Sequence, residues 1–287
     1  EALLAGMEEL AEETGPLVLI GEGLPGGSLL LPPGASPQES RWRVIVDPID
    51  GSRGLMHQKR SAWILTGAAP DRGPATTLAD LEIAVQTEIP LVKQHLSDSV
   101  WARRGGGVLA ERYNRLNGER TPLQLAPSAA SSPRHGFATV VRFFPGAREL
   151  LGAIDDELFE AALGTPFDGR ASCFEDQYIS SGGQLYELMA GRDRLVIDVR
   201  PIALRKLSAG RYDEPCAHPY DLCTELAARE AGVVVTAVDG EQLRAPLDVR
   251  TPVNWVAFAN TRLAKVIQPL LQEALRKRGL LEPQAQP

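Results

Sequence analysis

Cysteine is scarce in this sequence of 287 residues, which has only Cys173, Cys216 and Cys223. The number is odd and no Cys-x-x-Cys pair occurs, so the pattern predicts no disulfide framework, and a chain of this length can hold a core without one. We therefore expect a protein of the reducing cytoplasm.

Basic clusters and long apolar runs are also missing. The formal net charge is −7 and basic residues never gather in a block, which argues against a general nucleic-acid binder. The longest apolar runs, "LVLI" at 17–20 and "GVVVTAV" at 232–238, are far shorter than a membrane span. The sequence therefore predicts neither nucleic acid nor a bilayer as a partner.

The composition is that of an ordinary folded protein, with 44% hydrophobic and 23% charged residues. The first half reads as a helix followed by strands of one antiparallel sheet, at 17–22, 42–48, 61–70, 81–89 and 98–104. Glycine and proline predict loops at 24–40 and 103–127. Because Glu1 already lies in a helical pattern, we expect the chain to begin within a longer protein.

The second half alternates helices with strands, which is typical of an α/β arrangement. Helices are predicted at 146–164, 182–191, 219–232 and 263–279, and strands at 194–201, 233–238 and 255–260. The segment 128–134 is the best candidate for a boundary. We accordingly predict two closely joined parts, 1–132 and 133–287.

The segment "VDPIDGS", residues 46–52, places two carboxylates around a proline at the end of an apolar strand. Pro48 should end the strand, so that Asp47 and Asp50 converge beyond it. Converging carboxylates need a cation, and their hard oxygens suit Mg²⁺, which usually keeps waters and binds substrate phosphates. The residues alone leave open a plain turn with two solvated aspartates.

Gly51 and Ser52 follow at once and could hold a phosphate, since glycine lets the backbone approach and the next N–H groups begin a short helix. Glu22 ends its own strand as Asp47 does, which predicts a place at the same sheet rim; a solvated loop glutamate is the alternative. Asp221 begins a predicted helix, where it is either a third metal carboxylate or an N-cap.

These segments resemble the inositol monophosphatase and fructose-1,6-bisphosphatase superfamily of Mg²⁺-dependent, lithium-sensitive phosphatases. "LIGEG" resembles its Gly-Glu-Glu segment and "VDPIDGS" its Asp-Pro-Ile/Leu-Asp-Gly-Thr/Ser signature. "HPYDLCTELAAREAGVVV" resembles its Trp-Asp-Leu…Glu-Ala-Gly-Gly segment, and "VWARRGGGVL" its Ala-x-x-Gly-x-Gly turn. The similarity extends over nearly the whole chain.

The resemblance implies a layered αβαβα sandwich of mixed α/β (α+β) class, antiparallel in its first sheet and mostly parallel in its second. It implies two or three Mg²⁺ ions, held by Glu22, Asp47, the carbonyl of Ile49, Asp50 and Asp221. Gly51 and Ser52 would bind phosphate, with Glu22, Asp47 and Ser52 as the catalytic group. It also implies a homodimer.

The sequence departs from the family in three places and adds one segment, and one departure is Tyr220 in place of the usual tryptophan. Gly23 stands where the family has a second glutamate, and the aspartate that pairs with the signature hydroxyl falls, by count, before Glu1. Glu214 lies at the family's spacing for binding a substrate hydroxyl, or is a surface acid. Residues 194–210 read as an added strand and basic loop, whose Arg200, Arg205 and Lys206 are either solvated or bind a second phosphate.

The leading prediction is a Mg²⁺-dependent phosphomonoesterase that hydrolyses a small polyol, sugar or nucleotide phosphate with metal-activated water. One alternative is a non-catalytic relative that senses a ligand or binds a protein. Another is a sugar bisphosphatase, which rests on the basic residues of 194–210. Carboxylates that repel one another without a cation argue against the non-catalytic alternative.

Overall fold

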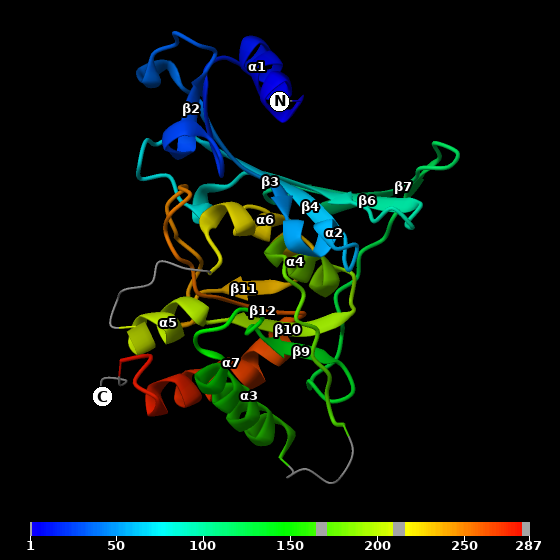
Figure 1. Ribbon diagram of the computed structural model, residues 1–287, viewed down its shortest axis with the longest axis vertical. Coiled ribbons are helices and arrows are strands. Elements are labelled where there is room, and N and C mark those ends of the chain that lie inside the picture. Colours follow the sequence, from blue (N-terminus) through cyan, green and yellow to red (C-terminus); the bar gives the residue numbers. More distant parts are fainter. Residues whose placement is uncertain (1, 165–170, 209–215, 283–287) are drawn as a thin grey trace.

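Two β-sheets alternate with three layers of helices in the computed structural model (Figure 1), which describes residues 2–164, 171–208 and 216–282. From top to bottom in Figure 1 the order is helix, sheet, helices, sheet, helices. The predicted αβαβα sandwich is therefore confirmed.

The first sheet is formed by the N-terminal part of the chain. Its strands are β1 (Leu17–Gly21), β2 (Ser28–Leu31), β3 (Trp42–Asp50), β4 (Ala62–Pro70), β5 (Ile83–Ile89), β6 (Leu96–Arg103), β7 (Val108–Asn114) and β8 (Arg120–Pro122). They lie in the order β2-β1-β3-β4-β5-β6-β7-β8. Every neighbouring pair is antiparallel except β1 and β3.

Two segments predicted as loops belong to this sheet. Within 24–40, β2 pairs with β1 and buries Leu31 completely, so a short apolar run outweighs the glycines and prolines around it. Within 103–127, β7 and β8 form a hairpin whose turn is closed by the Gly118 N–H donating to the carbonyl of Asn114. Asn117 and Gly118 are a common hairpin signal, and they connect two strands here.

The outer face of the first sheet is covered at one end by α1 (Ala2–Thr14) (Figure 1). Leu3, Leu4 and Met7 of this helix pack on a small core that includes Leu19 and Val46. The inner face packs on α4 (Ser181–Met189) and α6 (Glu225–Glu230). These two middle helices also pack on the second sheet, so one core fills the space between the sheets.

The second sheet has the order β11-β12-β10-β9, from β9 (Phe137–Val140), β10 (Asp193–Asp198), β11 (Val234–Thr236) and β12 (Trp255–Phe258). β9 and β10 are parallel, whereas β12 runs antiparallel to both β10 and β11. The sheet is therefore mixed, and the expectation of a mostly parallel one was wrong in that detail. Its outer face carries α3 (Arg148–Leu163) and α7 (Thr261–Lys277).

The strand predicted at 194–201 is confirmed as β10, but the basic loop predicted after it was wrong. β10 is a central strand of the second sheet, and the residues after it form a helix, α5 (Arg200–Ser208). The helix predicted at 219–232 is split into a 3-10 turn, Pro219–Leu222, and α6. Neither change alters the predicted layers.

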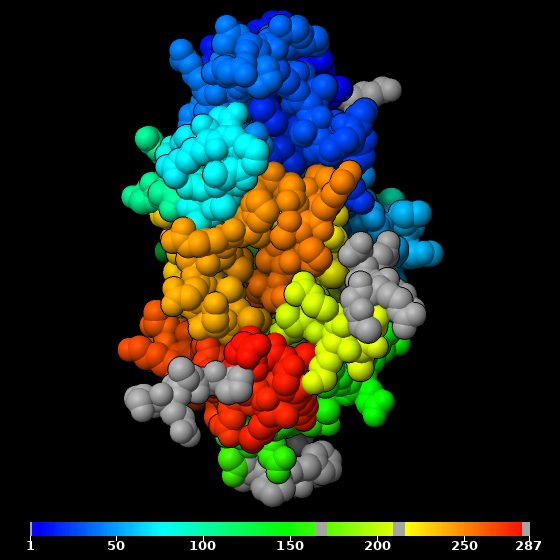
Figure 2. All heavy atoms as spheres, turned by 90° about the vertical axis from the view of Figure 1, so that its left-hand side faces the viewer, coloured from blue at the N-terminus to red at the C-terminus, as the bar shows by residue number. Residues whose placement is uncertain are grey.

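The two sheets are also bridged by residues 237–254, orange in Figure 2, which reach from the second sheet up to the first. Thr77 forms a β-bridge with Pro246, and the Leu78 N–H donates to the carbonyl of Ala245. The first sheet uses residues 17–122 and the second 137–258. A division at 132/133 stays a prediction, because the core is continuous across it.

Candidate metal and phosphate site

A β-bulge in β3 places Asp47 and Asp50 on the same face of the first sheet. Asp47 lies opposite Leu65 and Asp50 opposite Trp63, so three steps along β3 match two along β4. Side chains of a regular strand alternate between faces, and an offset of three would put the two carboxylates on opposite faces. The extra residue brings both to the inner face, and the strand continues to Asp50 instead of ending at Pro48.

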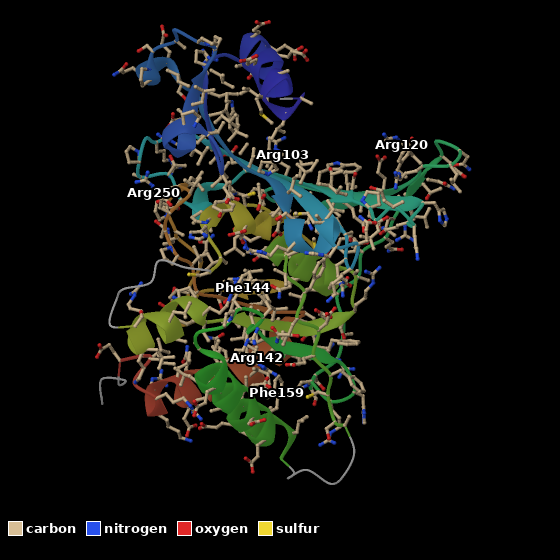
Figure 3. All side chains as sticks on the ribbon, in the orientation of Figure 1. Arg103, Arg120, Arg142, Phe144, Phe159 and Arg250 are labelled. Carbon is tan, nitrogen blue, oxygen red and sulfur yellow. The ribbon has the colours of Figure 1, made fainter. Side chains whose placement is uncertain are left out.

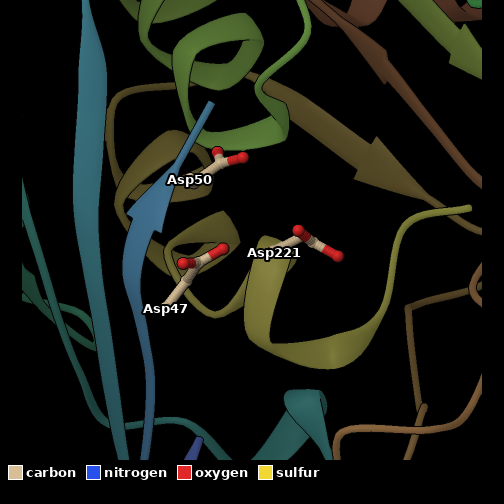
Figure 4. A group of neighbouring side chains, drawn as sticks. All are labelled: Asp47, Asp50 and Asp221. Atoms are coloured by element: carbon tan, nitrogen blue, oxygen red, sulfur yellow. The ribbon is translucent and has the colours of Figure 1, made fainter. Parts of the chain in front are cut away.

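The carboxylates of Asp47, Asp50 and Asp221 converge in the space between the sheets (Figure 4). One oxygen from each residue lies within 4.8 Å of the others. All three line a cavity of about 800 Å³, a size typical of small-molecule sites. The structure thus brings together three of the predicted metal ligands, from two distant parts of the chain.

Asp50 is oriented by the first turn of α4. Its Oδ2 accepts hydrogen bonds from the Ser180 hydroxyl at 2.8 Å and the Gly182 N–H at 2.7 Å. The Ser180 Oγ also accepts from the Gly183 N–H at 2.8 Å, so Ser180 caps the helix and binds the carboxylate at once. One oxygen of Asp50 is therefore satisfied by protein, which leaves Oδ1 without a hydrogen bond to the described residues.

Burial and mutual repulsion disfavour the charged forms of these acids. Burial, followed by the charges of Asp221 and Glu22, raises the pKa of Asp47 to about 7, even though the Ile49 N–H donates to it at 2.9 Å. Burial and the charges of Asp47 and Asp221 hold the pKa of Asp50 well above its ordinary value. Because a divalent cation would remove this penalty, the donor set fits Mg²⁺.

Asp221 lies in the 3-10 turn Pro219–Leu222, where its Oδ2 accepts from the His218 N–H at 2.6 Å. The N-cap of this turn is His218 and Asp221 is its third residue, so the expectation of Asp221 as an N-cap was wrong, although its carboxylate accepts from the N–H of the capping residue. It faces the cavity at the same time. The hydrogen bond within the turn is compatible with a metal-binding role, because a carboxylate has two oxygens.

Glu22 and Ile49 line the same cavity at its exposed side. Glu22 follows β1, which runs parallel to β3, so parallel strands bring it to the rim as predicted. It is not one of the three carboxylates that lie within 4.8 Å of one another. If Glu22 is a metal ligand, as predicted, it would bind from the exposed side of the cavity, outside the group of three aspartates.

Gly51 and Ser52 also line the cavity, where Ser52 begins the short helix α2 (Ser52–Met56). Gly51 has a φ of +90°, and a Cβ there would lie 3.0 Å from the Cβ of Ser180 and 3.1 Å from the carbonyl oxygen of Ile179. Only glycine allows this close approach. Gly51 thus allows the residues just before α4 to pack closely on the turn that follows Asp50.

The remaining predicted residues have mixed outcomes. Glu214 lies outside the described residues. Arg205 and Lys206 are exposed on α5 and do not line the cavity, whereas Arg200 does. The sequence reasoning missed Ser180, although a serine just before "SGGQL" is the usual sign of a helix N-cap.

Three solved structures resemble this chain over most of its length. A hypothetical protein from Pyrococcus horikoshii, with similarities for inositol-1 monophosphatase, has a TM-score of 0.59 at 17% identity and covers 93% of this chain and 80% of its own. The extragenic suppressor protein SuhB from Bartonella henselae has 0.58 at 18%, covering 96% and 82%. The MJ0109 gene product, an inositol monophosphatase-fructose 1,6 bisphosphatase, has 0.57 at 15%, covering 92% and 82%.

Comparison of the sequence alone identifies no relatives. No protein-family model matches it, and a search of curated proteins gives no significant match. The likeness to the three solved structures is therefore a likeness of fold, and the site residues must be argued from this chain's own geometry.

Proposed function

We propose, on the basis that this chain has the fold of the inositol monophosphatase superfamily, that it is a Mg²⁺-dependent phosphomonoesterase acting on a small polyol, sugar or nucleotide phosphate. The observation that carries the proposal is the convergence of Asp47, Asp50 and Asp221 in one cavity beside Gly51 and Ser52. Acidic oxygens next to backbone N–H groups and a hydroxyl suit a metal and a phosphate together.

In this proposal Asp47, Asp50 and Asp221 hold two or three Mg²⁺ ions, with Glu22 and the Ile49 carbonyl completing the set. Bound Mg²⁺ would make a water more acidic at neutral pH and offset charge on the phosphoryl group. Asp50 is kept in place for this by Ser180 and Gly182.

The phosphate is placed by Gly51 and Ser52. Gly51 has a left-handed backbone, precedes α2 and lines the cavity with Ser52, and N–H groups at such a turn can bind phosphate oxygens. In the proposal the hydroxyl of Ser52, which also lines the cavity, would orient the attacking water. Hydrolysis is direct, so the proposal includes no phosphoenzyme.

The non-catalytic alternative is disfavoured by the burial of Asp47 and Asp50, which are 4% and 6% exposed. Two buried like charges cost stability and would bring no benefit without a cation. The proposal keeps a cytoplasmic homodimer as an expectation from the sequence. Within the described ranges, no helix combines the length and the apolar character needed to cross a membrane.

The proposal is tested by measuring phosphate release from a panel of inositol, sugar and nucleotide monophosphates with and without Mg²⁺. We expect release from at least one of them that depends on Mg²⁺ and stops on chelation. If the protein binds Mg²⁺ but releases no phosphate from any member, the non-catalytic alternative replaces this proposal.

A further inference from the structure

Two phenylalanines and two arginines form one stacked group in the wall of the same cavity. Phe143 and Phe144, between β9 and α3, line it together with Arg53 of α2 and Arg200 of α5. The two rings meet edge to face with centroids 4.8 Å apart. Phe144 lies between the two sheets in Figure 3. We call these four residues the aromatic wall.

Arg200 fixes the inner side of the aromatic wall. Its Nε and Nη2 donate to the two oxygens of Asp198 at 2.8 and 2.5 Å, and both side chains are buried. Its guanidinium lies 4.4 Å from the ring centroid of Phe143 and 5.6 Å from that of Phe144. Because the charge of Arg200 is balanced by Asp198, we assign Arg200 the role of holding the two rings in place.

Arg53 has a different environment. Its guanidinium lies 5.2 Å from the ring centroid of Phe144, and the residue is exposed. No ion pair joins it to an acid in the part of the chain that the structure describes. Arg53 also comes directly after Ser52, so it places a positive charge next to the proposed phosphate site.

We infer that Arg53 binds a second anionic group, a phosphate or a carboxylate, on the leaving-group part of the substrate. The inference rests on the proposed function and narrows its substrate class. Phe144 is a positioning residue: its ring, held by Arg200 and Phe143, supports the Arg53 guanidinium at the cavity by a cation–π contact.

The chemistry of the cavity favours this class of substrate. Its four carboxylates, Glu22, Asp47, Asp50 and Asp221, face the proposed metals and the reacting phosphate, so Arg53 is left to attract a further anion. A guanidinium binds a phosphate or carboxylate through paired hydrogen bonds. A neutral leaving group would make no such bonds. The structure thus shifts the second-phosphate prediction from Arg205 and Lys206, which do not reach the cavity, to Arg53.

The test compares matched substrates that differ only in the second anion. One pair is glycerol 2-phosphate and 2-phosphoglycerate, which differ by a carboxylate. The other is fructose 1-phosphate and fructose 1,6-bisphosphate. We expect kcat/KM to favour the doubly anionic member of a pair by roughly ten- to a hundredfold, the usual contribution of hydrogen bonds to a charged group. Comparing the preference in the carboxylate pair with that in the phosphate pair shows which of the two anions Arg53 binds.

The variants are Arg53→Gln, which removes the charge, and Arg53→Lys, which keeps it without the planar group. We expect the preference to disappear in Arg53→Gln and to be partly kept in Arg53→Lys. Phe144→Leu should lower the preference through KM with little change in kcat. The control is Arg103→Gln, on an exposed arginine of β6 in the first sheet (Figure 3), which should leave the preference unchanged.

Each result decides the inference separately from the proposed function. An equal loss on both members of a pair in Arg53→Gln would place Arg53 at the reacting phosphate and overturn the inference. The inference also fails if the wild-type protein hydrolyses the panel without preferring a second anion. Absence of Mg²⁺-dependent release from every substrate would instead overturn the proposed function.

Discussion

Asp50 and Ser180 lie 130 residues apart in the sequence and share a hydrogen bond of 2.8 Å in the structure. The bond joins the strand that carries two candidate metal ligands to the helix between the sheets. Because the Ser180 hydroxyl donates to Asp50 while accepting from the Gly183 N–H, the cap of α4 also orients a carboxylate. The site is thus built by packing between parts of the chain that are far apart in sequence.

Ser180→Ala should weaken metal binding. Without the hydroxyl, Asp50 loses one of its two protein donors and is held by the Gly182 N–H alone. We therefore expect a severalfold rise in the Mn²⁺ dissociation constant, measured by electron paramagnetic resonance. Loss of the cap should also lower the free energy of unfolding by about 1 kcal/mol.

A matched control for Ser180→Ala separates these two effects. Asn260 caps α7 by accepting from the N–H groups of Arg262 and Leu263, far from the site in sequence. Asn260→Ala should lower stability to a similar degree without changing Mn²⁺ affinity. Equal Mn²⁺ affinity in the two variants would contradict the role of Ser180.

The stability of the metal-free protein should fall as the pH rises from 5 to 8. The pKa of Asp47 is raised to about 7 from an ordinary value of 3.8, so the folded state keeps a proton that the unfolded state has lost. The stabilisation is complete below pH 4 or so and is lost as the pH passes through about 7. Thermal unfolding at several pH values measures the slope, and saturating Mg²⁺ should flatten it.

Two variants identify the groups behind this slope. Burial also raises the pKa of Asp193 to about 7, but Asp193 does not line the cavity. Asp47→Asn should reduce the pH dependence of stability that disappears when Mg²⁺ is added. Asp193→Asn should reduce only the pH dependence that remains in saturating Mg²⁺. A slope that neither Mg²⁺ nor Asp47→Asn changes would contradict the assignment.

Glu22→Gln should raise the Mg²⁺ concentration needed for half-maximal activity while leaving the fold intact. The side chain is exposed at the cavity, so its neutral form costs no packing. Its charge also contributes to the raised pKa of Asp47. An unchanged Mg²⁺ titration would remove Glu22 from the ligand set.

Most strands and helices could be predicted from the sequence because they depend on local patterns, whereas the layered sandwich was implied by the family resemblance. Apolar strands, Pro48 and the acids around it are visible along the chain, and they led to Asp47 and Asp50. The β-bulge was not predictable, because it appears only when β3 is paired with β4. It is nonetheless what puts the two carboxylates on one face.

The wrong secondary-structure predictions also arise because tertiary contacts are not visible in the sequence. β2 and β8 lie in glycine- and proline-rich segments and exist because they pair with a neighbouring strand. α5 contains Pro201 near its first residue, and its mixture of apolar and basic residues suggested a loop. Arg53 and Phe144 are 91 positions apart, and only the fold shows that they touch.

The most direct test of the account is phosphate release by the wild-type protein and by Asp47→Asn over a range of Mg²⁺ concentrations. The substitution removes one of the three converging carboxylates with almost no change in volume. We predict Mg²⁺-dependent release from the wild type and none above background from the variant, although the variant folds and is at least as stable without metal. Wild-type rates in Asp47→Asn would contradict the account.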